Sequence, residues 1–269
     1  MAAVAAIHIQ DALGGVEGFF LQRRKRQGGF SATPRLPATI EDTYHALRSL
    51  DILSRMGIQV SGGLFEGHSP FLKAKLDEGA FGMENLFRLV WSLRYLGIID
   101  RDEAAMTVWP LVQERITGHL EDLFYLKRLA KLLNGLPGEL GEAGPFDAES
   151  PVSAHETTGL RRARMYIFLN DRRMDEASRS RWIEWIWACQ NGDGGFGFMP
   201  WTTSFMENCW YALDVLNLLG SGPEDIQGLV SFILSARSAS GGFGRKNLGV
   251  PFPETTYQAL SCLQVIAEL

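Results

Sequence analysis

Three stretches of fifteen residues share one frame, and each ends in Gly-Gly-Phe. They begin at Val16, Trp182 and Leu229. In all three, ten residues separate the Phe from a glutamate, and an amphipathic segment follows that glutamate. The glutamates are Glu41, Glu207 and Glu254. Identical spacing in three places indicates an internal repeat, and a repeat of this length indicates stacked supersecondary units.

Weaker copies of the same frame lie between the strong ones. Glu84 opens ENLFRLVWSLRYLG, Glu121 opens EDLFYLKRLAKLLN and Glu156 opens ETTGLRRARMYIFL. The frame then predicts six units of about 45 residues, which together use the whole chain. Because such a unit cannot bury its apolar face alone, its neighbours must stack. We therefore expect one domain over residues 1–269, closed into a ring.

One unit is expected to form a helical hairpin. The first helix should end at Gly-Gly, since glycine tolerates the left-handed conformation that stops helices. The Phe that follows can pack back between the two helices. The glutamate suits the positive amino end of the second helix. The second helices are more apolar all round, as an inner layer should be. The sequence shows no alternating strand pattern, so the predicted class is all-α.

Composition narrows the possible partners and location. The chain is 46% hydrophobic, enough for a full core, and its net charge of −5 argues against nucleic acid as the main partner. Three cysteines do not form a disulfide framework and favour a reducing compartment. The first ten residues make a poor secretory signal, and no apolar run is long enough to span a bilayer. We expect a cytoplasmic protein without a transmembrane segment.

The repeat resembles the prenyltransferase and squalene-cyclase repeat. The Gly-Gly-Phe turns and the helices after them carry the likeness, which is strongest in the first, fifth and sixth units. The family includes protein prenyltransferase β subunits and class II terpenoid cyclases. The resemblance implies an α/α toroid of six inner and six outer helices, and a central cavity that binds a prenyl diphosphate. Its transferases need zinc and a helical partner subunit, so a protein partner is also possible here.

Residues three, four and seven places after each glutamate share its helix face and are candidates to line the cavity. Aromatic side chains there suit a polyene, and arginines near convergent helix amino ends suit a diphosphate. The aromatic candidates are Tyr44, Phe87, Trp91, Phe124, Tyr125, Trp210, Tyr211 and Tyr257. The cationic candidates at these places are Arg48, Arg88 and Arg128. Arg161 and Arg162 are candidates for a different reason, since they belong to a cluster of arginines at the start of the fourth inner helix that suits a diphosphate or an acidic partner. The alternative is that these aromatics are ordinary core and the arginines lie at the surface or pair with the glutamates.

The resemblance also names candidates for catalysis. Class II cyclases have an Asp-x-Asp-Asp-Thr motif whose middle acid protonates the substrate. In Thr39-Ile40-Glu41-Asp42-Thr43, Glu41 replaces that middle acid, Asp42 matches the next position, and Thr39 replaces the first Asp. The simpler interpretation is that the recurring glutamates cap their helices or pair with a neighbour.

Zinc can be assessed in the same way. The transferases hold zinc with an Asp-x-Cys pair on one inner helix and a His on the next. His45 stands where that His would be, but Cys209 is one place early and the next unit offers Gln258. The spacing of ligands therefore supports neither zinc nor magnesium, and we predict no metal site.

Three functions are compatible with these features. The first is a prenyltransferase-like enzyme that binds a prenyl diphosphate. The second is a proton-initiated terpenoid cyclase without zinc, and the third is a non-catalytic toroid that binds a lipid or a protein. We place the transferase first, because the units around Tyr44 and Tyr257 are similar to those of the β subunits.

Overall fold

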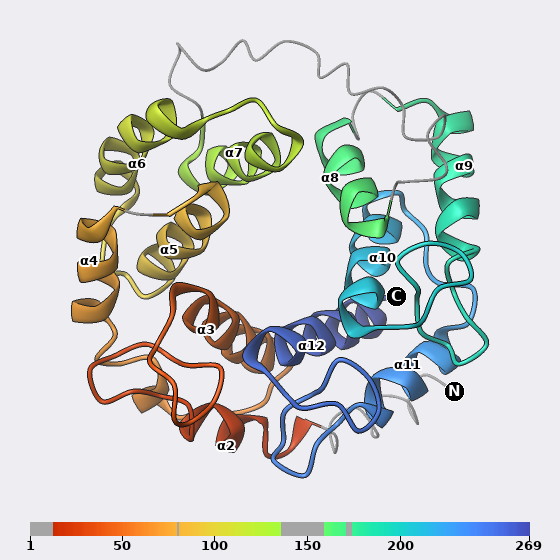
Figure 1. Ribbon diagram of the computed structural model, residues 1–269, viewed down its shortest axis with the longest axis horizontal. Coiled ribbons are helices and arrows are strands. Elements are labelled where there is room, and N and C mark those ends of the chain that lie inside the picture. The colour runs from red at the N-terminus through yellow and green to blue at the C-terminus, as the bar shows by residue number, and fades with distance from the viewer. Residues whose placement is uncertain (1–12, 80, 136–158, 171–173) are drawn as a thin grey trace.

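The computed structural model describes residues 13–79, 81–135, 159–170 and 174–269, and these residues form helices in two concentric layers (Figure 1). The inner layer consists of α3 (Ile40–Arg55), α5 (Met83–Tyr95), α7 (Leu120–Leu133), α8 (Leu160–Asn170), α10 (Met206–Leu218) and α12 (Pro253–Glu268). The outer layer consists of α2 (Val16–Leu21), α4 (Ser69–Glu78), α6 (Arg101–Arg115), α9 (Glu176–Trp187) and α11 (Ile226–Ser235), and a short 3-10 turn, η1 (Gly62–Leu64), precedes α4.

The inner helices form a closed ring. Each inner helix contacts the next along the chain, and α12 returns to contact α3 (Figure 1). The predicted all-α toroid is therefore confirmed. The outer helix of the fourth hairpin would fall within 136–158, outside the described residues, so the count of six complete hairpins stays a prediction. None of the described helices is both long and apolar enough to cross a membrane.

Burial explains why the inner helices are apolar on several sides. In α3 the side chains of Ala46, Leu47, Leu50 and Leu53 have no exposed surface. They belong to a cluster that joins the first, fifth and sixth hairpins with α8. A second cluster centres on α5, α6 and α7. A helix packed between an outer helix and two ring neighbours can keep only its pocket-facing stripe free of this core.

The Gly-Gly pairs do not end the outer helices, which corrects the prediction. The helices end six or seven residues earlier, at Leu21, Trp187 and Ser235. A tight hairpin follows in each case, closed by the bridges Arg24–Phe30, Gln190–Phe196 and Arg237–Phe243. The first glycine of each pair turns that hairpin with a positive φ, of 94° at Gly28, 83° at Gly194 and 90° at Gly241. Glycine is required there because other side chains strain this conformation.

The Phe after each Gly-Gly pair is an anchor between the two helices, as predicted. Phe30, Phe196 and Phe243 have no exposed surface. The backbone N–H of each Phe donates to the side chain two places after the glutamate. The acceptors are Thr43 Oγ1 at 2.9 Å, Cys209 Sγ at 3.3 Å and Thr256 Oγ1 at 3.0 Å. The loop and the inner helix are thus joined in the same way in all three hairpins.

Candidate binding site at the amino ends of the inner helices

Each inner helix has a charged residue at its second position. It is Glu41, Glu84, Glu121, Glu207 and Glu254 in α3, α5, α7, α10 and α12. In α8, which begins at Leu160, it is Arg161. The predicted sixth glutamate, Glu156, lies outside the described residues, and the register drawn from it is wrong. Arg164 and Met165 take the third and fourth places after Arg161.

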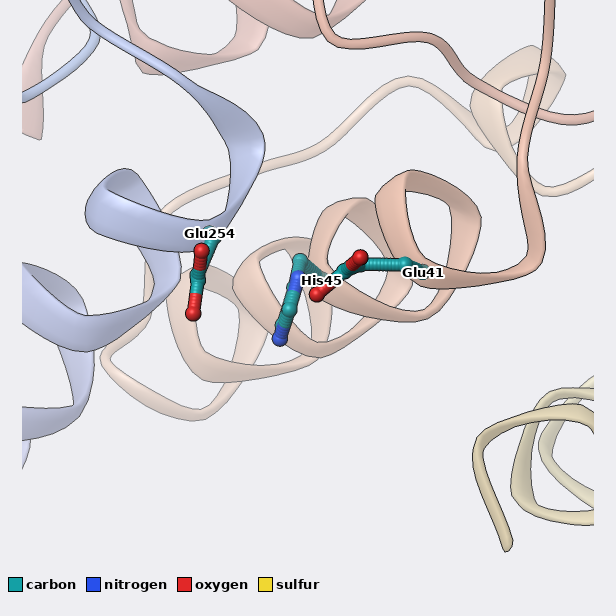
Figure 2. A group of neighbouring side chains, drawn as sticks. All are labelled: Glu41, His45 and Glu254. Atoms are coloured by element: carbon teal, nitrogen blue, oxygen red, sulfur yellow. The ribbon is translucent and has the colours of Figure 1, made fainter. Parts of the chain in front are cut away.

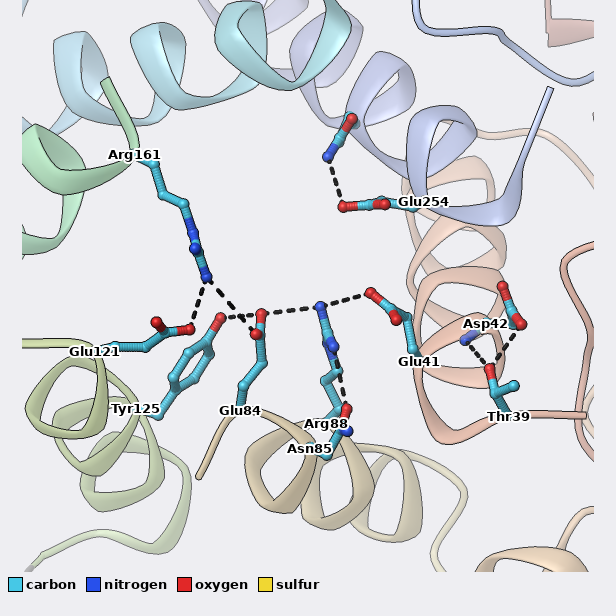
Figure 3. A network of polar contacts seen from close by, with 11 residues as sticks. Thr39, Glu41, Asp42, Glu84, Asn85, Arg88, Glu121, Tyr125, Arg161 and Glu254 are labelled. Atoms are coloured by element: carbon cyan, nitrogen blue, oxygen red, sulfur yellow. Dashed lines mark hydrogen bonds and ion pairs between the residues drawn. The ribbon is translucent and has the colours of Figure 1, made fainter. Parts of the chain in front are cut away.

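Three arginines pair with the glutamates around the mouth of the ring. Arg245 pairs with Glu207, and Figure 3 shows the other two, Arg88 and Arg161. Arg88 Nη2 lies 3.0 Å from Glu41 Oε1 and 2.9 Å from Glu84 Oε1. Arg161 Nη2 lies 2.7 Å from Glu121 Oε1 and 3.8 Å from Glu84 Oε2. An arginine at a helix amino end opposes its own helix dipole, so the neighbouring carboxylates compensate for it. The prediction that the glutamates pair with neighbours is thus confirmed for Glu41, Glu84, Glu121 and Glu207.

Below the mouth, residues from all six inner helices converge on one pocket. Its lining is Tyr44, His45, Glu84, Phe87, Arg88, Phe124, Tyr125, Arg128, Arg161, Arg164, Met165, Trp210, Tyr211 and Glu254. Nine of the thirteen predicted binding residues are in this set, together with His45. The predicted face of the inner helices is therefore largely the one that faces the pocket.

The arginines of the pocket rest on aromatic rings. The guanidinium of Arg128 lies 4.1 Å from the ring centre of Phe87, and that of Arg164 lies 4.2 Å from the ring centre of Trp210. Arg164 also forms an ion pair with Asp214 of α10. No carboxylate within 4 Å of Arg128 is found among the described residues. Among the described residues, its guanidinium lies over the rings of Phe87 and Phe124 and donates a side-chain hydrogen bond to the Tyr44 hydroxyl.

The centre of the ring is filled more tightly than the sequence predicted. The deep pocket has a volume of ≈ 40 Å³, which is room for a few water molecules. Edge-to-face contacts of Tyr44 with Phe87, Trp91 and Tyr257 close the space that an open aromatic cavity would occupy. The mouth above it is larger, at ≈ 580 Å³. Glu84, Arg88, Arg161, Tyr211 and Glu254 line both spaces.

Three predicted lining residues form the layer beneath the pocket instead. The guanidinium of Arg48 lies 5.0 Å from the ring centre of Trp91 and 5.5 Å from that of Tyr257. Burial alone would raise the pKa of Tyr257, but the charges of Arg48 and Arg128 lower it. Arg48 and Trp91 lie seven places after Glu41 and Glu84, about one helical turn deeper than the pocket wall. Tyr257 lies only three places after Glu254, but its ring packs against those of Tyr44, His45 and Trp210. They shape the pocket floor without lining it.

Two further predicted residues do not line the pocket. Arg162 is exposed, because one residue after Arg161 the helix has turned by about 100°. Asp42 is buried on the side of α3 away from the mouth (Figure 3), where its carboxylate accepts from Thr39 Oγ1 at 2.6 Å. Burial raises the pKa of Asp42, and the hydrogen bond from Thr39 opposes that rise. The structure therefore gives Asp42 a place in the cap of α3 and not in the pocket.

A family model described as the prenyltransferase alpha-alpha toroid domain matches residues 6–85 and 164–269. The matched stretches cover well over half of the chain. This protein belongs to the prenyltransferase toroid family. No curated protein matches the sequence.

The thiol that comes nearest to the zinc pattern of prenyltransferase toroids has a structural role here. Cys209 Sγ accepts the hydrogen bond from Phe196 N–H that Thr43 and Thr256 accept in other hairpins. It has no exposed surface, and burial raises the pKa of its thiol to about 12. A zinc ligand must be a thiolate. Cys209 therefore does not fit the family's zinc chemistry.

Replacement of Cys209 tests this role. Cys209→Thr should keep the free energy of unfolding within about 1 kcal/mol, since threonine accepts the same hydrogen bond in the first and sixth hairpins. Cys209→Val should cost about 1–3 kcal/mol, because it leaves the buried Phe196 N–H without an acceptor. Urea unfolding followed by circular dichroism measures both. Equal losses for the two variants would contradict the assignment.

Three potential metal ligands meet where α12 joins α3 (Figure 2). His45 lies between Glu41 and Glu254, and one ligand atom from each lies within 4.8 Å of the others. His45 is 4% exposed and its Nδ1 has no hydrogen-bond partner. Burial, then the charges of Arg88 and Arg48, lower the pKa of His45 well below its ordinary value. Its ring is thus neutral near pH 7 and keeps one nitrogen lone pair. Spacing along the chain missed this set because its members come from opposite ends of the sequence.

Proposed function

We propose that this toroid binds a prenyl diphosphate, with the diphosphate held by Arg88, Arg128, Arg161 and Arg164. The observation that carries the proposal is the convergence of these four arginines, from α5, α7 and α8, on one pocket at the amino ends of the ring. Helix amino ends and guanidinium groups are the features that proteins use for phosphate groups. The family described as prenyltransferase toroids supports the choice of an isoprenoid ligand.

Arg128 is the strongest element of the anion site. Its guanidinium lies over Phe87 and has no carboxylate partner among the described residues. Arg88 and Arg161 already hold carboxylates, and a diphosphate could replace these with charge-assisted hydrogen bonds of the same kind. The diphosphate would therefore replace the carboxylate partners of Arg88 and Arg161, and it would give Arg128 an anionic partner.

The isoprenoid chain needs more space than the deep pocket offers. The mouth has a volume of ≈ 580 Å³, which falls within the range of small-molecule sites. Val250 and Phe252 line it and are 66% and 40% exposed, which is unusual for apolar side chains beside a cavity. We place the first part of the chain against these residues and Tyr211. Deeper entry requires the aromatic side chains of the floor to change rotamer.

We place transfer ahead of cyclisation. The family description and the similarity of the strongest repeats both favour a transferase. A cyclase would use Glu41 as its acid, and in this structure Glu41 forms an ion pair with Arg88. A non-catalytic toroid would bind the ligand without turnover. A transferase also needs an acceptor for the prenyl group. The proposal therefore includes an acceptor, and a protein partner of the kind that transferases of the family need.

Thermal stability in the presence of prenyl diphosphates of different chain length tests the binding site. A ligand that binds only the folded state raises the unfolding midpoint. We expect a rise for the wild type and for Arg162→Gln, whose side chain is exposed beside the site. Arg128→Gln and Arg161→Gln should weaken binding about 10- to 100-fold each, the value of one charge-assisted hydrogen bond.

The controls separate charge from chain recognition. Inorganic diphosphate should raise the midpoint less than the prenyl form, because it lacks the apolar contacts. Product analysis with a thiol acceptor then distinguishes transfer from cyclisation. No rise with any chain length, or an equal rise in Arg128→Gln and the wild type, would refute the proposed site.

A further inference from the structure

We infer that Glu41, His45 and Glu254 form a site for one divalent cation, of the type that accepts mixed nitrogen and oxygen ligands, such as Mn²⁺ or Zn²⁺. The three side chains come from the first and last inner helices and meet only because the ring closes (Figure 2). This ligand set contains no cysteine. It also does not depend on the proposed isoprenoid ligand, because the three residues would bind the cation on their own.

The first argument is the state of His45. It is a buried side chain, 4% exposed, with a ring nitrogen that has no hydrogen-bond partner. A buried polar atom without a partner costs free energy, so such an atom needs an explanation. The ring is fixed in place by stacking on Tyr257, with centres 5.4 Å apart, and by an edge contact with Tyr44. It stands between two carboxylates that can approach it.

The second argument is geometry. Ligand atoms around a divalent cation lie about 3 to 4 Å from one another when each is about 2.1 Å from the metal. The three candidate atoms are within 4.8 Å. The remaining gap is small enough for the rotatable glutamate side chains to close while His45 stays in place. Two carboxylates and a neutral imidazole suit the mixed-ligand cations named above.

The third argument is the surrounding contacts. Gln258 Nε2 donates to Glu254 Oε1 at 3.2 Å and so orients that carboxylate from one turn along α12. Arg88 Nη2 lies 3.0 Å from Glu41 Oε1, and this ion pair would have to break before Glu41 could bind the cation. Glu41 lines the mouth, His45 lines the deep pocket, and Glu254 lines both. The cation would therefore sit at the junction of the two spaces.

Calorimetric titration of chelator-treated protein with Mn²⁺ and with Zn²⁺, without any isoprenoid, tests the site. We expect one cation per chain. Glu41→Gln and Glu254→Gln should each weaken binding at least about tenfold. Glu121→Gln is the matched control, since it changes the same position of α7 outside the cluster, and it should bind like the wild type. These glutamates are partly or fully exposed, so the variants should fold.

Arg88→Gln gives a readout that a purely structural role for the cluster would not produce. It frees Glu41 and removes a positive charge beside the cation, so it should tighten cation binding several-fold while it weakens prenyl diphosphate binding. The two proposals can thus fail separately. The absence of binding up to about 1 mM of either cation, or wild-type affinity in the Glu41→Gln/Glu254→Gln double variant, would overturn the inference.

Discussion

Gly241→Ala should destabilise the protein by about 3–5 kcal/mol, which would be among the largest losses that one methyl group can cause. Gly241 has a φ of +90°, and a Cβ there would lie 2.2 Å from the carbonyl oxygen of Gly15. Two backbones therefore touch at the place where the last hairpin meets the start of α2. Because neither can yield like a flexible side chain, the substitution would push apart the first and last units of the ring.

Gly57→Ala separates the clash from the backbone strain. Gly57 has a similar φ of +79° after α3, but a Cβ there would meet nothing within 4 Å. It should cost only the left-handed strain of about 1–2 kcal/mol. Urea unfolding of both variants gives the comparison. If Gly241→Ala lost no more than Gly57→Ala, the close contact with Gly15 would contribute nothing to closure.

Asp214→Ala is expected to cost about 3 kcal/mol, which corresponds to a fall in the unfolding midpoint of roughly 6–12 °C. Asp214 is the ion-pair partner of Arg164, whose side chain is 8% exposed and lies over Trp210. Removing the carboxylate leaves a buried guanidinium without its counter-charge. The pair also ties α10 to α8.

The double variant Arg164→Met/Asp214→Ala shows whether the unpaired charge causes the loss. Methionine keeps most of the volume of the arginine stem but carries no charge. At least half of the lost stability should return, as measured by differential scanning calorimetry. A double variant that is less stable than Asp214→Ala would instead assign the loss to packing of Arg164 against the aromatic rings.

Much of the candidate site could be predicted from one hairpin at a time. The place of Tyr44, Phe87, Phe124 and Trp210 three residues after a charged helix start put them on the pocket face, and the structure agrees. The errors have two sources. The fourth hairpin has Arg161 and not a glutamate at the start of its inner helix, so its register was set by the wrong residue. The depth of Arg48 depends on how far each helix extends into the ring, which one hairpin cannot show.

The amino-acid pattern was enough to predict the all-α class, the ring of repeated hairpins, the Phe anchors and the glutamates at the helix starts. These features follow from periodicity and from short-range hydrogen bonds, which each hairpin contains. Three-dimensional packing was needed to show that aromatic rings fill the centre, that Cys209 is an acceptor for a loop N–H, and that Glu254 meets His45. Such contacts join helices that are far apart along the chain, and only ring closure fixes their distance and orientation.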